Sequence, residues 1–271
     1  MTAAIDIGEP DRLAFLFGAV AVDAGAAVMG FFRRDADVRT KQDGSPVTQA
    51  DLAAETLIRH RLSALFPGLV IVGEESCERI DSVPDVFFLV DPLDGTREFI
   101  AGREDFTINI ALVKAGLPFA GCVYAPALHR LYLGGARAFR AMVNPGMPLP
   151  PDAQLEEIRT RPYPASGLRA VASRSHRDPR TEAFLKTLTL DSCREVGSSL
   201  KFCLIAEGEA DVYPRLARTR EWDIAAGHAV LAAAGGRIAG QDGQPLRYGN
   251  VGGDFLSGDF VAWGRPSLGA W

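Results

Sequence analysis

The sequence predicts an α/β (α+β) fold built from two subdomains. Short apolar runs typical of buried strands alternate along the chain with longer segments whose apolar residues recur at helical spacing. A chain of 271 residues with 47% hydrophobic content can also bury a large core. The proline-rich stretch 144–152, NPGMPLPPD, predicts a boundary, so we expect an N-terminal α+β subdomain over 1–151 and a C-terminal α/β subdomain over 152–271.

Two helices are predicted near the N-terminus. The segment Leu13–Phe32 is long and apolar enough to span a bilayer, but Asp23 near its centre and the acidic residues before it argue against insertion. We therefore expect a helix packed in the core and no stable membrane insertion. The segment Gln49–Leu65 has apolar residues at helical spacing and ends before a Pro-Gly pair, which places Asp51 in the first turn.

The remaining elements alternate between strands and helices. Predicted strands cover the apolar start of 69–76 and residues 86–90, 106–113, 120–124, 130–133 and 168–173. Predicted helices cover 178–187, 198–208 and the segment from Asp223 to Gly236. Acidic residues follow two of the predicted strands directly, which draws attention to the ends of those strands.

The first of these acidic segments is VFFLVDPLDGTREFI at 86–100. Its apolar strand ends at Asp91, and Pro92 biases Asp91 toward an extended backbone, so the carboxylate projects beyond the sheet. Asp94 follows three residues later, and carboxylate oxygens are the ligands that Mg²⁺ prefers. An isolated Asp-Gly pair would indicate only a turn, but the strand, the proline and the second aspartate together favour a metal site.

Gly95 and Thr96 follow at the start of a predicted helix. Gly95 permits a sharp turn, and the free amides of both residues at a helix N-terminus favour an anion. The same short stretch therefore offers oxygen ligands for cations and amide donors for a phosphate.

Two further acidic segments lie elsewhere in the chain. In LVIVGEES at 69–76, an apolar strand leads to Glu74 and Glu75, of which one is expected to turn inward, although an exposed acidic loop is the alternative. In EWDIAAGHAVLAAAGG at 221–236, Asp223 precedes a helix of small residues. Asp223 is either a simple N-cap or a ligand brought close to another segment by that small-residue helix.

Taken in this order and at these separations, GEES, DPLDGT and WDIAAG resemble the signature of the lithium-sensitive, magnesium-dependent phosphatase superfamily, which includes the inositol monophosphatases and the fructose bisphosphatases. The longer segments DPLDGTREFI, GREDFTINIALV and GSSLKFCLIAEGEADVYPRL resemble the CysQ branch of 3'(2'),5'-bisphosphate nucleotidases. The resemblance covers most of the chain and implies an inositol monophosphatase-like, layered αβαβα sandwich.

The resemblance also implies a role for each matching residue. Two or three Mg²⁺ ions would be held by Glu74, Asp91, Asp94, Asp223 and the backbone carbonyl of Leu93. Thr96 and Glu74 would orient and help deprotonate the attacking water, and Asp51 would accept a hydrogen bond from the Thr96 hydroxyl. No protein nucleophile is required, because clustered metal ions activate water and neutralise phosphoryl charge.

Substrate contacts are expected mainly from the second half of the chain. The implied substrate is a phosphorylated nucleotide, adenosine 3',5'-bisphosphate, which would be converted to AMP and phosphate. The implied contact residues are Gly95, Thr96, His176, Ser198, Lys201, Arg215 and Asp223. Lysine and arginine suit phosphate, although each also has an ordinary structural explanation as a surface or helix charge. Arg97 and Ile224 depart from the usual CysQ pattern without touching an implied metal ligand.

The composition limits which binding partners and which cellular compartment we expect. The net charge of −5 argues against polymeric nucleic acid, because counterion release needs a basic surface. Four dispersed cysteines without CxxC spacing indicate reduced core residues in a cytoplasmic protein, with peripheral association at the inner membrane left open. A monomer and a homodimer are equally compatible with the sequence.

Two other functions remain open at this point. One is an inositol monophosphatase or a related small sugar or polyol phosphatase. The other is a non-catalytic nucleotide or metal sensor, which the complete carboxylate set disfavours because a sensor has no need of a water-orienting pair.

Overall fold

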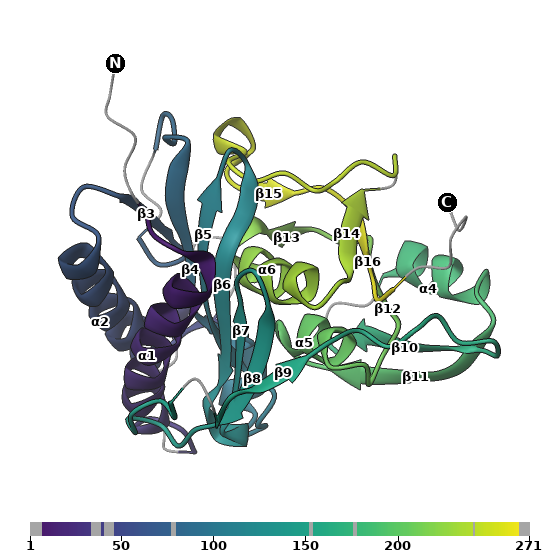
Figure 1. Cartoon of the computed structure of the whole chain (residues 1–271), viewed down its shortest axis with the longest axis horizontal. Coiled ribbons are helices and arrows are strands. Elements are labelled where there is room, and N and C mark those ends of the chain that lie inside the picture. Colours follow the sequence, from purple (N-terminus) through teal and green to yellow (C-terminus); the bar gives the residue numbers. More distant parts are fainter. Residues whose placement is uncertain are drawn as a thin grey trace.

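Two β-sheets with helices between and outside them form the protein in a computed structural model, which describes residues 7–33, 39–40, 46–76, 80–151, 154–175, 178–240 and 242–265. Helices α1 and α2 cover the outer face of the first sheet, α5 and α6 lie between the sheets, and α4 lies outside the second sheet (Figure 1). The layers therefore follow the order αβαβα, and the predicted fold class is confirmed.

The first sheet has seven strands among the described residues, in the order β3-β4-β5-β6-β7-β8-β9. Only β3 and β4 run parallel within that sheet, and the later pairs are antiparallel. The strands are β3 (Val70–Gly73), β4 (Val86–Asp94), β5 (Thr107–Lys114), β6 (Leu117–Ala125), β7 (Arg130–Gly134), β8 (Ala138–Met142) and β9 (Glu156–Ile158). Because β3 and β4 are parallel neighbours, the acidic segments that follow them meet at one edge of the sheet.

The second sheet has five strands in the described part of the chain, in the order β11-β10-β12-β16-β14. These are β10 (Leu168–Ser173), β11 (Leu190–Val196), β12 (Val212–Arg215), β14 (Arg237–Gly240) and β16 (Phe260–Trp263). Among the residues that the structure describes, two short antiparallel pairs lie outside the large sheets: β1 (Arg39–Thr40) with β2 (Pro46–Val47), and β13 (Thr219–Arg220) with β15 (Leu256–Ser257).

The predicted helices are present with small changes at their ends. The α-helices are α1 (Pro10–Met29), α2 (Gln49–Leu65), α3 (Thr96–Ile100), α4 (Pro179–Lys186), α5 (Leu200–Ala206) and α6 (Ala225–Ala233). Short 3₁₀ turns are η1 (Pro126–Leu128), η3 (Glu221–Asp223) and η4 (Val251–Gly253). Thr48 caps α2 by accepting a hydrogen bond from Ala50 N, and the Asp51 carboxylate accepts one from Thr48 N in return.

Helix α1 is long and apolar enough to cross a membrane by length and composition, and 56% of its most apolar window is buried inside the protein. Phe17 is fully buried and makes an edge contact with Phe88 of β4 at a ring-centroid distance of 5.5 Å. Asp23, the charge near the centre of the helix, forms a 2.9 Å ion pair with Arg61 of α2. The predicted core packing of this helix is therefore confirmed.

The end of β4 and the exposure of one cysteine differ from the sequence-based expectations. Strand β4 does not end at Val90 but continues to Asp94, because Asp91 pairs with Asn109 and Asp94 pairs with Thr107 of β5 across an irregularity in the register. Cys122 and Cys203 are buried as expected, but Cys193 is exposed on the edge strand β11. Cys77 and His176 lie outside the described residues.

The division into subdomains at 151/152 stays a prediction. The first sheet takes its last strand, β9, from beyond that point, where it pairs with β8.

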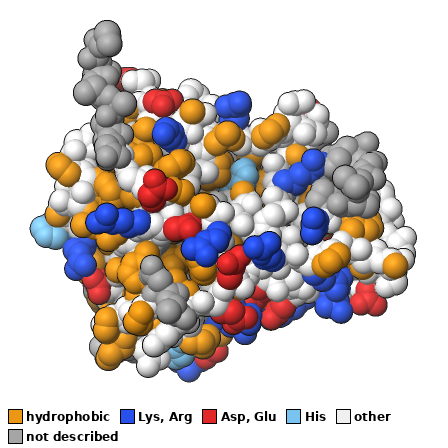
Figure 2. Space-filling model, viewed as in Figure 1, with side chains coloured by type: hydrophobic (Ala, Val, Ile, Leu, Met, Phe, Trp, Pro, Cys, Tyr) orange, Lys and Arg blue, Asp and Glu red, His pale blue; other side chains and the backbone are white. Residues whose placement is uncertain are grey.

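On the face seen in Figure 2, basic and acidic side chains are interspersed over the surface.

Candidate active site

The DPLDGT segment brings two carboxylates to one edge of the first sheet. Between Asp91 and Asp94 the register of β4 against β5 shifts, which lets both residues line the same cavity. Gly95 then has φ +94°, a left-handed conformation that residues with a side chain rarely adopt, and α3 begins at Thr96. The glycine therefore makes the sharp change from strand to helix that the sequence predicted.

Glu74 is the inward residue of the Glu-Glu pair. Its backbone N–H donates to Val90 O at 3.2 Å, which extends the pairing of β3 with β4, and its side chain lines the cavity. The backbone of the next residue, Glu75, is fixed by a hydrogen bond, because its N–H donates to Oε2 of the buried Glu55 at 2.8 Å. A Cβ atom on Gly73 would stand 2.6 Å from Glu55 Oε1, so a larger residue at this position would push the Glu55 carboxylate away from Glu75 N.

Asp223 belongs to η3 and is not the N-cap of α6, which is Ile224. Its Oδ2 accepts hydrogen bonds from Thr219 Oγ1 at 2.5 Å and from Arg220 N at 3.0 Å. The simple capping role considered from the sequence is therefore wrong. The hydrogen bonds fix the carboxylate where it also lines the cavity.

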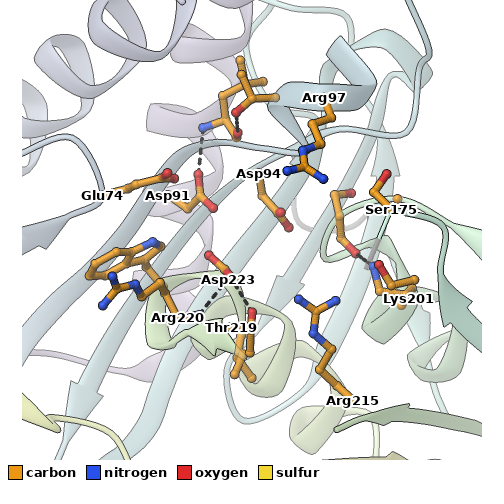
Figure 3. Close-up of a pocket in the computed structure, with 18 of the residues that line it drawn as sticks. Glu74, Asp91, Asp94, Arg97, Ser175, Lys201, Arg215, Thr219, Arg220 and Asp223 are labelled. Atoms are coloured by element: carbon orange, nitrogen blue, oxygen red, sulfur yellow. Dashed lines mark hydrogen bonds between the residues drawn. The ribbon is translucent and has the colours of Figure 1, made fainter. Parts of the chain in front are cut away.

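The acidic residues from these three segments converge on one cavity of about 430 Å³. Figure 3 shows Glu74, Asp91, Asp94 and Asp223 directed toward a shared space. Among the described residues, however, no three Asp, Glu, His or Cys side chains already stand at the spacing of a closed metal site. The carboxylates therefore form one wall of an open cavity, which we call the acidic wall.

The electrostatics of the acidic wall favour a bound cation. Burial raises the pKa of Asp91 well above its usual range, and the neighbouring Glu74, Asp94 and Asp223 raise it further. Burial also raises the pKa of Asp94 to about 6, with a further contribution from Asp223. An all-oxygen donor set with room beside it fits Mg²⁺, which keeps several waters and binds through one or two carboxylates plus substrate oxygens.

Thr96 and Asp51 form the expected pair at the edge of the acidic wall. The Thr96 hydroxyl lies 3.3 Å from Asp51 Oδ1 and 3.2 Å from Leu93 O, both of which can accept its hydrogen. Asp51 is 1% exposed, and its other oxygen, Oδ2, accepts hydrogen bonds from Thr48 N at 2.8 Å and Thr48 Oγ1 at 2.6 Å. The carboxylate is thus locked in the orientation that meets Thr96.

Two buried cations line the opposite side of the cavity, which we call the basic wall. Lys201 is 4% exposed and Arg215 is 7% exposed, and both border the cavity (Figure 3). Burial lowers the pKa of Lys201 to about 8, against the opposing influence of Asp94. Arg215 donates to Arg218 O at 3.0 Å, while its Nε is buried without a hydrogen-bond partner among the described residues. Such an unpaired donor is costly unless a ligand satisfies it.

The other expected substrate contacts have different outcomes. Ser198 and Gly95 border the cavity, together with Thr96 and Asp223. Ser198 has φ +51°, an uncommon conformation for a residue other than glycine. His176 lies outside the described residues, so its role stays a prediction.

Sequence reasoning missed two residues behind the acidic wall. Ser199 and Asn109 are buried, and both lie within hydrogen-bonding distance of Asp94 Oδ2, at 3.1 and 3.4 Å respectively. A signal for Asn109 was available, because a polar residue in the apolar strand segment TINIALV requires a partner. Ser199 adjoins Ser198 in GSSLKFC, and no residue pattern around it predicts a contact with Asp94.

Comparison with known proteins adds independent information. The inositol monophosphatase family matches residues 10–263. The chain is 40% identical over 234 residues to the 3'(2'),5'-bisphosphate nucleotidase CysQ of Shigella flexneri, covering 84% of this chain and 91% of that protein. Among solved structures, it is similar to CysQ from Bacteroides thetaiotaomicron, with a TM-score of 0.79, 33% identity and coverage of 95% and 98% of the two chains. An IMPase of Thermotoga maritima matches with a TM-score of 0.75, 25% identity and coverage of 93% and 92%.

Proposed function

The chain belongs to the inositol monophosphatase family, and from this premise we propose that it is a Mg²⁺-dependent phosphomonoesterase acting on 3'(2'),5'-bisphosphate nucleotides. Adenosine 3',5'-bisphosphate would be converted to AMP and phosphate. The observation that carries the proposal is a single cavity with carboxylates on one wall and two buried cations on the other. One wall suits a phosphoryl group bound with cations, and the other suits a second anionic group.

The acidic wall would hold two or three Mg²⁺ ions through Glu74, Asp91, Asp94, Asp223 and the carbonyl of Leu93. When bound, Mg²⁺ supplies Lewis-acid chemistry to the phosphoryl group and favours ionisation of the attacking water. Because this set of ligands is entirely oxygen and leaves one side open, substrate oxygens can complete the coordination.

Thr96 would orient the attacking water, with Glu74 beside it. The hydroxyl of Thr96 donates toward Asp51 or Leu93 O, so its lone pairs remain available to accept a hydrogen bond from water. Since Asp51 is itself fixed by Thr48, the direction of the Thr96 hydroxyl is set before substrate arrives.

The basic wall would recognise the phosphate that is not cleaved. Lys201 offers a point charge and Arg215 offers a planar set of donors, of which Nε has no partner in the part of the chain that the structure describes. A nucleotide carrying two phosphates would satisfy both walls at once, whereas an inositol monophosphate has a single phosphate to place. This difference favours the bisphosphate nucleotide over the polyol substrate.

The test is phosphate release by purified full-length protein with Mg²⁺, using adenosine 3',5'-bisphosphate, inositol 1-phosphate and fructose 1,6-bisphosphate in parallel. We expect the highest kcat/KM for the nucleotide, loss of activity with EDTA, and inhibition by Li⁺. A preference for inositol 1-phosphate would overturn the nucleotide assignment. Binding of the nucleotide with no phosphate release from any substrate would instead favour a sensor.

A further inference from the structure

Ser199 connects the two halves of the acidic wall without lining the cavity itself. Its Oγ lies 2.6 Å from the backbone carbonyl of Asp223 and 3.1 Å from Oδ2 of Asp94. Asp94 comes from β4 of the first sheet, whereas Asp223 comes from η3, more than 100 residues later in the sequence. One hydroxyl therefore touches both segments.

The hydrogen bonds of this hydroxyl can be assigned. Asn109 Nδ2 donates to Ser199 Oγ at 2.9 Å, so the serine accepts from β5. The single hydroxyl hydrogen is then shared between the Asp223 carbonyl and the Asp94 carboxylate, because both are acceptors. Asn109 is in turn fixed by Thr107 Oγ1, which lies 3.1 Å from Asn109 Oδ1. All of these groups are buried or partly buried, where water competes little.

The position of Ser199 makes these contacts unusual. Ser199 is the N-cap residue of α5, where a serine side chain ordinarily accepts a hydrogen bond from the first turn of its own helix. Here it makes no such capping bond, and its 1% exposed side chain is directed to Asp94 and Asp223 instead. The neighbouring Ser198 borders the cavity and has φ +51°.

We propose that Ser199 is a positioning residue that sets the separation of Asp94 and Asp223, and with it the affinity of the acidic wall for Mg²⁺. This inference rests on the proposed function in that it takes the wall as the metal site. Groups that orient metal ligands without touching the metal change affinity or activity by about 10- to 100-fold when they are removed. Ser198, by contrast, should influence only the substrate.

The experiment measures Mg²⁺ binding to the full-length protein by isothermal titration calorimetry, without substrate, and Mn²⁺ binding by electron paramagnetic resonance. For Ser199→Ala we expect the Kd for either ion to rise about 10-fold or more, while the metal-free protein still folds and melts only about 3 to 10 °C lower, because buried groups lose a hydrogen-bond partner. Ser199→Thr, which keeps the hydroxyl, should recover most of the affinity. Ser192→Ala, on the exposed edge strand β11, is the matched control and should bind like the wild type.

Three results would overturn the role of Ser199. These are a Kd for Ser199→Ala within twofold of the wild type, an equal loss in Ser192→Ala, and an equal loss in Ser199→Thr when that variant is folded. Should Ser199→Ala fail to fold, Ser199→Cys keeps the shape with a weaker donor and should still weaken ion binding. Metal affinity is read without substrate, so a wild type that binds Mg²⁺ yet does not hydrolyse the nucleotide would refute the proposed function alone.

Discussion

The two walls of the cavity both carry buried charge, but they are built differently. The acidic wall comes from three separate segments, the turn after β3, the end of β4, and η3, whose carboxylates repel one another and raise the pKa of Asp91. The basic wall comes from α5 and β12, which are close in sequence. Burial and the neighbouring Arg215 both lower the pKa of Lys201, because they disfavour its charged form. A bound cation or a proton therefore relieves the repulsion within the acidic wall, whereas an anion would offset the burial of the two cations in the basic wall. The contrast indicates that metal ions neutralise the acidic wall and that an anionic group of the substrate neutralises the basic wall.

The largest effect is expected from a change in the acidic wall. Asp94→Asn removes one charge from the carboxylate set and should lower kcat by more than about 100-fold at saturating nucleotide, because Lewis-acid activation is lost. The measurement is phosphate release with increasing Mg²⁺, alongside circular dichroism to verify the fold. Retention of a tenth of the wild-type kcat would contradict the role of Asp94 in the metal site.

A second effect separates water orientation from metal binding. Thr96→Val keeps the side-chain shape but removes the hydroxyl, and kcat should fall by roughly 100-fold, the scale of positioned acid-base groups. The Mg²⁺ dependence of the residual activity should change little. Thr96→Ser is the matched control and should retain most of the activity. A change confined to KM would show that Thr96 contacts substrate without orienting water.

A smaller effect is expected in the basic wall. Arg215→Ala should raise KM for adenosine 3',5'-bisphosphate by about 10- to 100-fold, the scale of a lost charge-assisted hydrogen bond, while kcat/KM for inositol 1-phosphate changes little. Steady-state kinetics with both substrates gives the comparison. Arg169→Ala, whose guanidinium is half exposed, is the control for loss of a positive charge. Equal losses for both substrates would place Arg215 outside the recognition of the second phosphate.

The smallest effect concerns stability and pH. The folded-state pKa of Asp94 is raised from 3.8 to about 6, so the folded protein binds more protons than the unfolded chain in that window and loses stability as pH rises through it. In EDTA, Asp94→Asn should therefore melt about 5 °C above the wild type at pH 7, with the difference vanishing near pH 4.

A measurement of the melting temperature with added Mg²⁺ complements this pH experiment. At about 100 times its Kd, Mg²⁺ should raise the wild-type melting temperature at pH 7 by about 5 to 10 °C, because it binds the folded state alone. The same titration should stabilise Asp94→Asn much less. If the variant and the wild type respond equally, Asp94 does not take part in binding Mg²⁺.

Much of this arrangement was predictable from local sequence. The apolar periodicity located α2 at Gln49–Leu65 and β10 at Leu168–Ser173, and the Gly-Thr pair located the start of α3. These predictions succeeded because each depends on neighbouring residues alone, through helical spacing, strand composition and the freedom of glycine at positive φ. The resemblance of three short motifs added the expectation that their carboxylates would meet.

Other features were decided only when the chain folded. The extension of β4 to Asp94 depends on pairing with β5, and the placement of Asp223 in η3 depends on hydrogen bonds from Thr219 and Arg220. Cys193 is exposed because β11 lies at a sheet edge, which its own sequence does not reveal.

The chain by itself determined which residues can carry the chemistry: oxygen donors after two strands and before a small-residue helix, and cations in the second half. Tertiary structure alone decided that Ser199, the residue beside the expected contact Ser198, joins Asp94 to Asp223. The physical reason is that hydrogen bonds between segments distant in sequence depend on separations of a few tenths of an ångström, which the packing of the two sheets fixes and no local pattern encodes.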